Sequence, residues 1–530
     1  MRRVAVLVTL FAFIVYLLTL APSVTWRNDG ADGGELIAAV VTGGVAHPSG
    51  YPTYLLLGSL FVRLPIGDIA HRLNLMSAAA AAGAAGLTLL AALASLRRTY
   101  AGSQRVHVLS GGVSALTLAF SSILWSQAVI SEVYALNAFF TALVWYLLLE
   151  ARAGRRRCVW PVAAAVFGVG LGNHLSLLML ALPSLVLIWA TWRRAGETVG
   201  HIPTQAAGGA KWRTVPAAIQ ILGICLAFVA GLAVYVALPL RAAQQAPVNW
   251  GGADTWDGFV WLVTGRAYGP LVAGLPVANL PGRALAAAAL LVRQAAWWGV
   301  PVAYFGVRAM WQRDRSLAVA TLLHAALVVV YAVGYNTADS YVYLIPAAVL
   351  LALWIAWGLP EVLAVVHTWA ADLPPRGRRL TTWMAGWGVL LLVVVPLAAN
   401  WQMVDANGDR SAYDYGVQTL TSVPENALIV ADSGVDTFPL WYFRYVEVRR
   451  PDVAIVNGNL LAFDWYRASL RRWHPAVALP AEGEDSGQML EALIEANLAR
   501  QPVYLTSTGW DLPPGLRLVS EGTLYRVVRP

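Results

Sequence analysis

A short polar segment near the N-terminus carries three carboxylates, Asp29, Asp32 and Glu35, within seven residues. A general base that takes the proton of an attacking hydroxyl needs such a group. Asp32 and Glu35 are three residues apart, so they share one face if a helix starts here. Because two like charges this close disfavour double ionisation, we expect a raised pKa for one of them.

The same spacing fits a plain helix cap, with Asp32 as the capping residue and Glu35 reaching back to it. For Asp29 we prefer a structural role of this kind. For Asp32 and Glu35 we prefer a catalytic role, because His47 follows beside a proline–glycine turn and is expected on the same face.

Further polar residues stand where apolar runs begin or end. Glu132 and Asn137 flank Tyr134 at the start of one run, and charged or amide groups there are costly unless they face a cavity. A helix-mouth cap explains them equally well. His174 lies where two apolar segments meet, and a lone histidine is more often structural than functional.

A long polar loop begins at Arg241 and contains Asn249. An arginine fork suits phosphate oxygens, so Arg241, just beyond an apolar run, is a candidate ligand for a lipid phosphate. Contact with lipid headgroups by snorkelling is the alternative, and it fits Arg283 better.

The composition says which elements must position these residues. Of the 530 residues, 58% are hydrophobic and only 12% are charged, about half the charged fraction of soluble domains. The apolar runs are long enough to cross a bilayer. The chain is therefore predicted to be a polytopic all-α membrane bundle, which excludes an ordinary soluble enzyme. Eleven spans are predicted, at about residues 4–22, 73–96, 106–124, 133–149, 159–172, 175–192, 215–240, 284–307, 316–335, 341–358 and 381–399.

The net charge of +8 comes almost entirely from arginines in short loops, the pattern of an orientation signal. We therefore expect no nucleic-acid partner. Alternate loops differ in their content of arginine and lysine, and the set with more of them includes Arg155, Arg156, Arg157, Lys211 and Arg213. Because loops rich in these residues face the cytoplasm, we expect a multi-pass cell-membrane protein whose N-terminus is cytoplasmic. The loops at 23–72, 125–132, 173–174, 241–283 and 336–340 are then extracytoplasmic.

The composition changes after residue 399, which divides the chain into a membrane domain (1–399) and a tail (400–530). The tail has short β-rich runs and one helical stretch, so a small extracytoplasmic α/β domain is predicted. Asp432 and Asp436 follow its first β-rich run, where open α/β sheets tend to bind ligands. A plain polar turn is the preferred interpretation.

No phosphate-binding loop, zinc-protease motif or paired-cysteine motif occurs in the sequence. No cofactor is predicted with certainty. Binding of a divalent cation is left open, because acidic residues could hold one. The pair Asp32 and Glu35 alone supplies too few ligands for such an ion.

The order of these features resembles the transmembrane-protein-260-type O-mannosyltransferases and their bacterial relatives in the GT-C glycosyltransferase superfamily. The resemblance is carried by Asp32-Gly33-Gly34-Glu35 with His47-Pro48-Ser49-Gly50-Tyr51-Pro52, and by Trp125 to Asn137, Gly172-Asn173-His174, Asn249-Trp250-Gly251 and Asp339 with Tyr343 and Pro346. Gly33 and Ser49 depart from the family pattern, but neither departure removes a titratable group.

The resemblance implies a GT-C-like bundle, a polyprenyl-phosphate-linked sugar donor, mannose among the candidate sugars, and a protein or glycan acceptor at the outer face. It also implies inverting transfer with a first-loop carboxylate as base. Asp32 is then the predicted base and Glu35 its partner. We expect Arg241, with His47 or His174, to bind the donor phosphate, and Glu132, Tyr134 and Asn249 to shape the sugar pocket.

Two alternatives from other classes remain. A transporter or flippase for lipid-linked glycans would use the same polar groups as a gate, but such proteins often carry inverted repeats, and none is visible in this sequence. A non-catalytic scaffold would tolerate charge-neutral changes at Asp32, Glu35 and His47.

Overall fold

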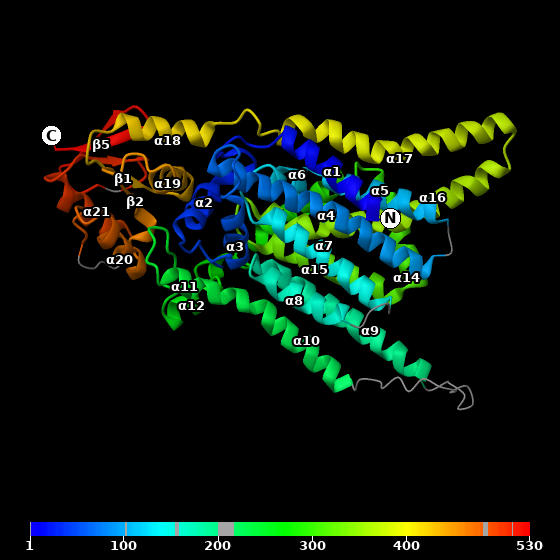
Figure 1. Cartoon of the computed structure of the whole chain (residues 1–530). Coiled ribbons are helices and arrows are strands. Elements are labelled where there is room, and N and C mark those ends of the chain that lie inside the picture. Colours follow the sequence, from blue (N-terminus) through cyan, green and yellow to red (C-terminus); the bar gives the residue numbers. More distant parts are fainter. Residues whose placement is uncertain are drawn as a thin grey trace.

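The structure is a computed structural model that describes residues 2–100, 103–153, 158–199, 217–480, 486–510 and 512–529. Long helices form an elongated bundle, and an α/β tail lies at one end of it (Figure 1). Of the predicted cytoplasmic cations, Arg155, Arg156, Arg157, Lys211 and Arg213 lie outside the described residues.

The bundle confirms the predicted fold class. Two of the predicted spans, at 106–124 and 284–307, run across a break between two helices instead of following one helix. The helices of the bundle are α1 (Arg2–Leu18), α4 (Ile69–Thr99), α5 (Gln104–Ala119), α6 (Ser122–Ala128), α7 (Tyr134–Arg152), α8 (Val159–Leu171), η2 (Leu175–Leu180), α9 (Ala181–Val199), α10 (Ala217–Leu232), η3 (Ala233–Val236), α13 (Leu280–Gln294), α14 (Gly299–Arg313), α15 (Arg315–Gly334), α16 (Ile345–Ala371) and α17 (Pro375–Val404).

Within the described ranges, seven helical segments are long and apolar enough to cross a membrane, or up to nine if each of two bent pairs is one span. The bent pairs are α5 with α6 and α13 with α14, at 64° and 92°. Helices α1 and α8, with 17 and 13 residues, are shorter than each of these seven segments. The chain is thus a multi-pass membrane protein, while the count of eleven spans stays a prediction.

Small residues let α4 pack at the centre of the bundle. Its alanine-rich middle is buried against α7 and α1. At Gly86 a β-carbon would collide with the Thr9 hydroxyl, so α1 and α4 approach closely at that point. Small residues permit this kind of close packing between membrane helices.

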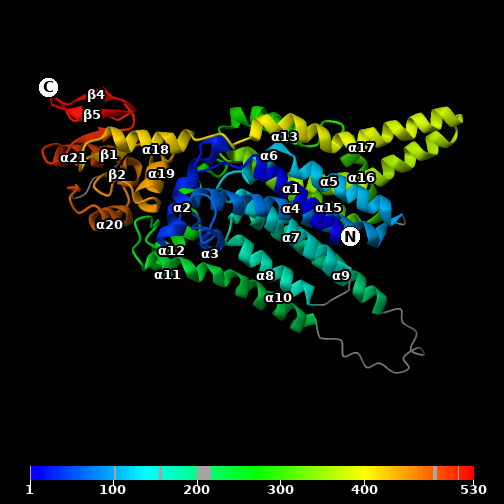
Figure 2. The same ribbon diagram turned by 45° about the horizontal axis from the view of Figure 1, so that its top comes forward.

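The loops at the tail end of the bundle fold into short helices (Figure 2). These are η1 (Arg27–Asp32), α2 (Gly33–Thr42), α3 (Pro52–Phe61), α11 (Ala237–Ala242), α12 (Trp256–Val263), η4 (Arg266–Leu271), η5 (Val277–Asn279) and η6 (Ser340–Leu344). They carry Asp32, Glu35 and Arg241, so loops between distant spans meet at one end of the molecule.

The tail contains a five-stranded sheet in the order β2-β1-β3-β5-β4, with β1 parallel to β2 and β3, and β5 antiparallel to β3 and β4. Its elements are α18 (Ser411–Ser422), β1 (Leu428–Ala431), α19 (Gly434–Trp441), η7 (Tyr442–Val446), β2 (Ala454–Asn457), η8 (Gly458–Leu460), α20 (Asp464–Trp473), α21 (Ser486–Leu498), β3 (Val503–Leu505), β4 (Arg517–Glu521) and β5 (Leu524–Val528). Strands β1, β2 and β3 are buried along their whole length because helices cover the parallel part of the sheet.

At the other end of the bundle, a buried ion pair joins α7 to α15. Arg152 Nη2 lies 3.0 Å from Asp314 Oδ1, and their side chains are 2% and 3% exposed. Asp314 also caps α15 by accepting from the backbone amide of Leu317. Removing one partner would leave a buried charge unpaired.

We expect Arg152→Met to lower the free energy of unfolding by about 3–5 kcal/mol, the cost of breaking a buried pair from one side. The double variant Arg152→Met/Asp314→Asn should recover part of that loss. Thermal unfolding in detergent measures both, and equal midpoints for the wild type and Arg152→Met would contradict the prediction.

Candidate active site

Glu35 and His47 form a buried pair at the start of α2. Glu35 is fully buried and lies in the first turn of the helix. Its Oε1 accepts from the backbone amide of His47 at 3.0 Å, and its Oε2 lies 2.9 Å from His47 Nδ1. The carboxylate thus holds both the backbone and the ring of His47 and gives the ring one fixed orientation.

Tyr51 and Asp32 lie at the other ring nitrogen. The Tyr51 hydroxyl donates to the Pro48 carbonyl at 3.1 Å and lies 3.1 Å from His47 Nε2. When that hydroxyl donates to Pro48, it can accept from Nε2–H, while Nδ1–H donates to Glu35. The site therefore accommodates His47 with both ring nitrogens protonated. Asp32 Oδ2 is 3.7 Å from Nε2.

The charges at this site agree with that protonation state. Burial lowers the pKa of His47, but the carboxylates of Glu35 and Asp32 outweigh it and raise the pKa to about 9. Burial raises the pKa of Glu35, and His47 opposes the rise. Asp32 is the accessible member, with 42% of its side chain exposed, against none for Glu35.

Enclosure by the surrounding protein raises the pKa of Asp32, His47 lowers it, and Asp339 raises it again, with a net upward shift. A carboxylate with a raised pKa is a better proton acceptor than an ordinary aspartate, and it lies at the accessible side of the buried pair. The arrangement can therefore take a proton from a group that enters beside Asp32.

We expect a pH dependence from this histidine. Because the folded pKa is raised, the His47–Glu35 ion pair contributes fully to stability below pH 6.5, and the contribution is lost as the pH rises from 6.5 to about 9. Thermal midpoints measured between pH 6 and 10 should fall over this window. In Glu35→Gln this component of the fall should be absent, and an unchanged fall would contradict the assignment.

Aromatic rings line the space beside the pair. The Tyr51 ring stacks on His174, with centroids 6.0 Å apart and planes at 15°. Tyr134 and Tyr343 lie 5.5 and 5.6 Å from His174. On the other side of His47, the rings of Trp250 and Tyr268 lie 6.0 and 6.5 Å away. The rings come from α7, η4, η6 and the loops that hold Tyr51, His174 and Trp250.

His174 is neutral in this environment. Its Nδ1 lies 2.8 Å from the Ser176 hydroxyl and accepts from the Ser176 backbone amide. Burial and then the positive charge of His47 lower the pKa of His174 to about 4. It therefore supplies a ring surface but no positive charge for a phosphate.

Glu132 lies between α6 and α7 and is 3% exposed. Burial, then the charges of Asp32 and Asp339, raise its pKa well above the usual value. Asp339 precedes η6, so four segments bring carboxylates into one electrostatic cluster: η1, α2, the α6–α7 loop and the residue before η6. Asp339, Tyr51, Tyr268, Trp250 and Tyr343 were not predicted as site residues, although all except Tyr268 stand in the stretches that carry the family resemblance.

Arg241 does not face this cluster. Its guanidinium donates to the carbonyls of Gly44 and Ala39 at 2.8 and 2.9 Å, at the C-terminal end of α2. Glu35 is four residues before Ala39, about 6 Å along the helix, and Arg241 is not among the charges that shift the pKa of Asp32, Glu35 or His47. Asn249 donates to the carbonyl of Ala242 and forms an isolated bridge with Val45. Both contacts fix α2 and the loop that follows it.

The tail packs directly on the first polar loop, residues 23–72. The Trp26 indole donates to the carbonyl of Val435 at 3.1 Å. A β-carbon on Gly34 would lie inside contact distance of the Phe438 carbonyl, so the start of α2 touches the backbone of α19. The absence of a side chain at position 34 is therefore what permits this contact.

Substituting Gly34 by alanine should push α19 away from α2. We expect a loss of about 1–3 kcal/mol in the free energy of unfolding, the usual cost of overpacking. Gly386→Ala is the matched control, because a β-carbon there meets no atom within 4 Å. Thermal unfolding of the two variants compares them, and equal midpoints would contradict the contact.

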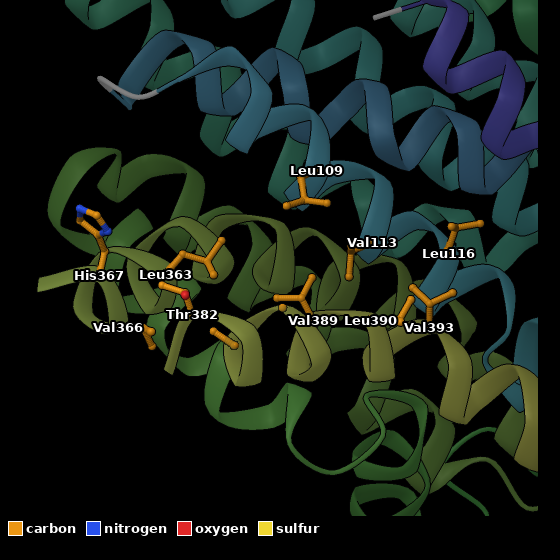
Figure 3. A pocket seen from close by; sticks show the side chains of 12 residues that line it. Leu109, Val113, Leu116, Leu363, Val366, His367, Thr382, Val389, Leu390 and Val393 are labelled. Atoms are coloured by element: carbon orange, nitrogen blue, oxygen red, sulfur yellow. The ribbon is translucent and has the colours of Figure 1, made fainter. Parts of the chain in front are cut away.

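In the part of the chain that the structure describes, no group of three or more His, Cys, Asp or Glu residues could hold a metal ion. The groove of 590 Å³ whose lining is drawn in Figure 3 is separate from the candidate site. It is lined by apolar residues of α5, α16 and α17, from Leu116 and Val393 to His367. His367 lies in α16, 23 residues after Leu344, the last residue of η6. About 35 Å of helix therefore separates His367 from η6, which carries the Tyr343 ring of the candidate site.

Two family models match the chain. The "Protein O-mannosyl-transferase TMEM260 N-terminal domain" matches residues 32–197, and the "TMEM260-associated domain 2" matches residues 412–484. The Mus musculus Protein O-mannosyl-transferase TMEM260 is 26% identical over 90% of this chain and 65% of its own length. The Dictyostelium discoideum protein of that name is 21% identical over 97% and 64%. The chain thus spans just under two thirds of these relatives.

The fold is similar to that of ArnT from Cupriavidus metallidurans, whose crystal structure was solved bound to undecaprenyl phosphate. The TM-score is 0.58 at 15% identity, over 98% of this chain and 97% of that one. The apo structure of the same protein gives a TM-score of 0.50. Together with the domain matches over residues 32–197 and 412–484, this confirms the resemblance to the TMEM260-type O-mannosyltransferases that was seen in the sequence.

Proposed function

We propose that this protein transfers a sugar from a polyprenyl-phosphate-linked donor to a hydroxyl of a protein or glycan acceptor. The observation that carries the proposal is the accessible Asp32 carboxylate beside the buried, charged His47–Glu35 pair. The names of the relatives, both O-mannosyltransferases, favour mannose as the sugar.

In the proposed reaction, the acceptor oxygen attacks the anomeric carbon while Asp32 takes its proton. The bond between the anomeric carbon and the phosphate oxygen breaks, and polyprenyl phosphate leaves. One in-line displacement inverts the anomeric configuration. The positive charge of His47, kept in place by Glu35, would stabilise the negative charge that develops on the leaving phosphate.

The residues around Asp32 suit a sugar ring. Tyr51, Tyr134 and Tyr343 offer aromatic faces, and the Glu132 carboxyl offers a polar group for hydroxyls. Asn249 would act indirectly, by holding the loop that presents Trp250 to His47. His174 would support the Tyr51 ring from behind and would contribute no charge.

Because Arg241 is occupied with the end of α2, another cation is a better candidate for the donor phosphate. Arg266 starts η4, two residues before Tyr268, whose ring faces His47. Its side chain is exposed, and it makes no hydrogen bond or ion pair with the residues that the structure describes. We propose Arg266 as the phosphate ligand and Arg241 as a positioning residue.

The predicted orientation completes the proposal. With the N-terminus in the cytoplasm, the cluster and the tail lie at the extracytoplasmic surface. A cysteine placed at the exposed Thr264 should then react with a membrane-impermeant maleimide in intact cells, and one at the exposed Asp372, in the turn between α16 and α17, should react only after permeabilisation.

Transfer and transport are separated by the product. Purified full-length protein is incubated with a labelled polyprenyl-phosphate mannose and a serine/threonine-containing acceptor peptide, and the peptide is analysed by mass spectrometry. Addition of one hexose to the peptide supports the proposal. Movement of intact labelled lipid across vesicles containing the protein, with the peptide unmodified, would favour a transporter and overturn it.

A further inference from the structure

A second group of polar residues lies in the tail, at the carboxyl edge of the parallel strands. The first strand, β1, is flanked by β2 on one side and β3 on the other. The chain continues from β1 to β2 on one side and from β3 to β4 and β5 on the other, so the connections after β1 and after β3 leave this edge in opposite directions. Such a switch point is where open α/β sheets bind ligands in a crevice. The segment after β1 contains Asp432, Ser433 and Asp436.

These residues form a connected network instead of a plain turn. Asp432 Oδ2 accepts from the Ser507 hydroxyl at 2.6 Å, and Asp436 Oδ2 accepts from the Ser433 hydroxyl at 2.9 Å. The Thr506 hydroxyl donates to Asp436 at 3.4 Å. Burial, and then the neighbouring Asp432 carboxylate, raise the pKa of Asp436. The pair can therefore hold a proton and both donate and accept hydrogen bonds.

A buried amide at the same edge lacks a partner. Asn457 ends β2 in register with Ala431, the residue before Asp432, and is 4% exposed. Its amide nitrogen donates to the Thr437 hydroxyl at 2.8 Å, and that hydroxyl donates to the carbonyl of Ser433. The Asn457 amide oxygen makes no hydrogen bond with any described residue. A ligand hydroxyl would satisfy it.

An aromatic ring covers the crevice from the side of β2. A β-carbon on Gly458 would lie 2.9 Å from Trp510 Cζ2 and 3.6 Å from the carbonyl oxygen of Ala431, so the indole and the end of β1 are neighbours. The Trp510 indole nitrogen is buried and also lacks a partner within the described ranges. The crevice thus combines an aromatic ring, two carboxyls and several hydroxyls.

We propose that this crevice binds a neutral carbohydrate. Carboxyls, amides and hydroxyls pair with the hydroxyls of a sugar, while an indole packs on its apolar face. A divalent cation fits less well, because the described residues contain no group of three acidic or histidine ligands. The helix that starts at the crevice, α19, also contacts the first loop through Val435 and Phe438.

Binding is independent of the transfer reaction proposed above, so the two can be tested separately. The probe is α-1,2-mannobiose, with saturation-transfer NMR on the full-length protein in detergent micelles. We expect saturable binding that weakens roughly tenfold in Asp436→Asn and in Trp510→Ala, the loss expected for one hydrogen bond or one ring contact.

Two variants serve as controls. Asp414→Asn alters an exposed aspartate of α18 in the same domain and should leave binding unchanged. Asp32→Asn alters the candidate active site and should also leave it unchanged, which separates the crevice from a donor or acceptor site in the bundle. Since the ring change in Trp510→Ala can affect folding, Trp510→Phe is expected to retain most of the binding.

The proposal would be overturned if mannobiose does not bind, or binds equally well to the Asp436 and Trp510 variants. It would also be overturned if calcium chloride or tetralysine binds to the crevice and mannobiose fails to displace it, since that would identify a site for cations.

Discussion

An Asp32→Asn variant of the full-length protein is expected to lose roughly 10²–10⁴-fold in the rate of sugar transfer, the usual contribution of a general base. The amide has the size of the carboxyl group and can still accept from neighbouring donors, but it cannot take the acceptor proton. The variant should fold normally, because Asp32 is the accessible member of the cluster. The measurement is the initial rate of hexose addition to the acceptor peptide.

Asp29→Asn is the matched control for that experiment. Asp29 lies in the same η1 segment and accepts from the Tyr341 hydroxyl at 2.6 Å, a contact that an amide oxygen can keep. Its transfer rate should stay close to that of the wild type. If Asp32→Asn transfers sugar at the wild-type rate while its thermal midpoint is unchanged, Asp32 is not the base.

The second large effect is expected from Glu35→Gln. This change removes the negative charge that keeps His47 protonated, so the pKa of His47 should fall from about 9 towards its ordinary value of 6.5. At neutral pH the positive charge proposed to stabilise the departing phosphate would then be largely lost. We expect the transfer rate to fall roughly 10²-fold, similar to removal of one electrostatic stabiliser.

The pH profile distinguishes this positioning role from a merely structural one. In the wild type the rate should fall as the pH rises through about 9, when His47 loses its proton. In Glu35→Gln the same fall should move to lower pH, and NMR titration of His47 should follow it. Glu361→Gln is the control, because that residue pairs with Arg313 on other helices. A rate loss without a shift of the alkaline limb would contradict the proposed role of Glu35.

Several features of the site could be predicted from residues that are close together in the sequence. Asp32, Glu35 and His47 lie within sixteen residues, so their proximity follows from local chain geometry, and the structure brings them together. The spacing could not distinguish their roles. It fitted a cap as well as a catalytic pair, and the structure shows that Glu35 accepts from His47 and no side-chain cap involves Asp32.

Arg241 shows where residue chemistry alone was insufficient. An arginine just beyond an apolar run suits a lipid phosphate, but it also suits the free carbonyls at the end of a helix. The choice depends on whether a helix terminus lies within reach. Here the C-terminal carbonyls of α2, about 200 positions earlier in the chain, are the partners. Nothing near Arg241 in the sequence indicates that contact.

The sequence by itself determined that most of this protein lies in a lipid bilayer and that its fold is a helical bundle. Burial of apolar runs in lipid depends on composition and length, both of which are local, and the alternation of such runs with polar loops fixes which loops lie at the same end. Those same loops contain Asp32, Glu35, His47 and Glu132, which is why the candidate residues could be named in advance.

Only the tertiary structure decided which member is buried, which is charged and which is accessible. A pKa depends on the distances to other charges and on exclusion of water. These are set by long-range packing such as the contacts of α2 with α19 and η7 of the tail, about 400 residues later in the chain. Asp339, Tyr268 and the crevice after β1 acquire their roles in the same way, from neighbours that long-range packing supplies.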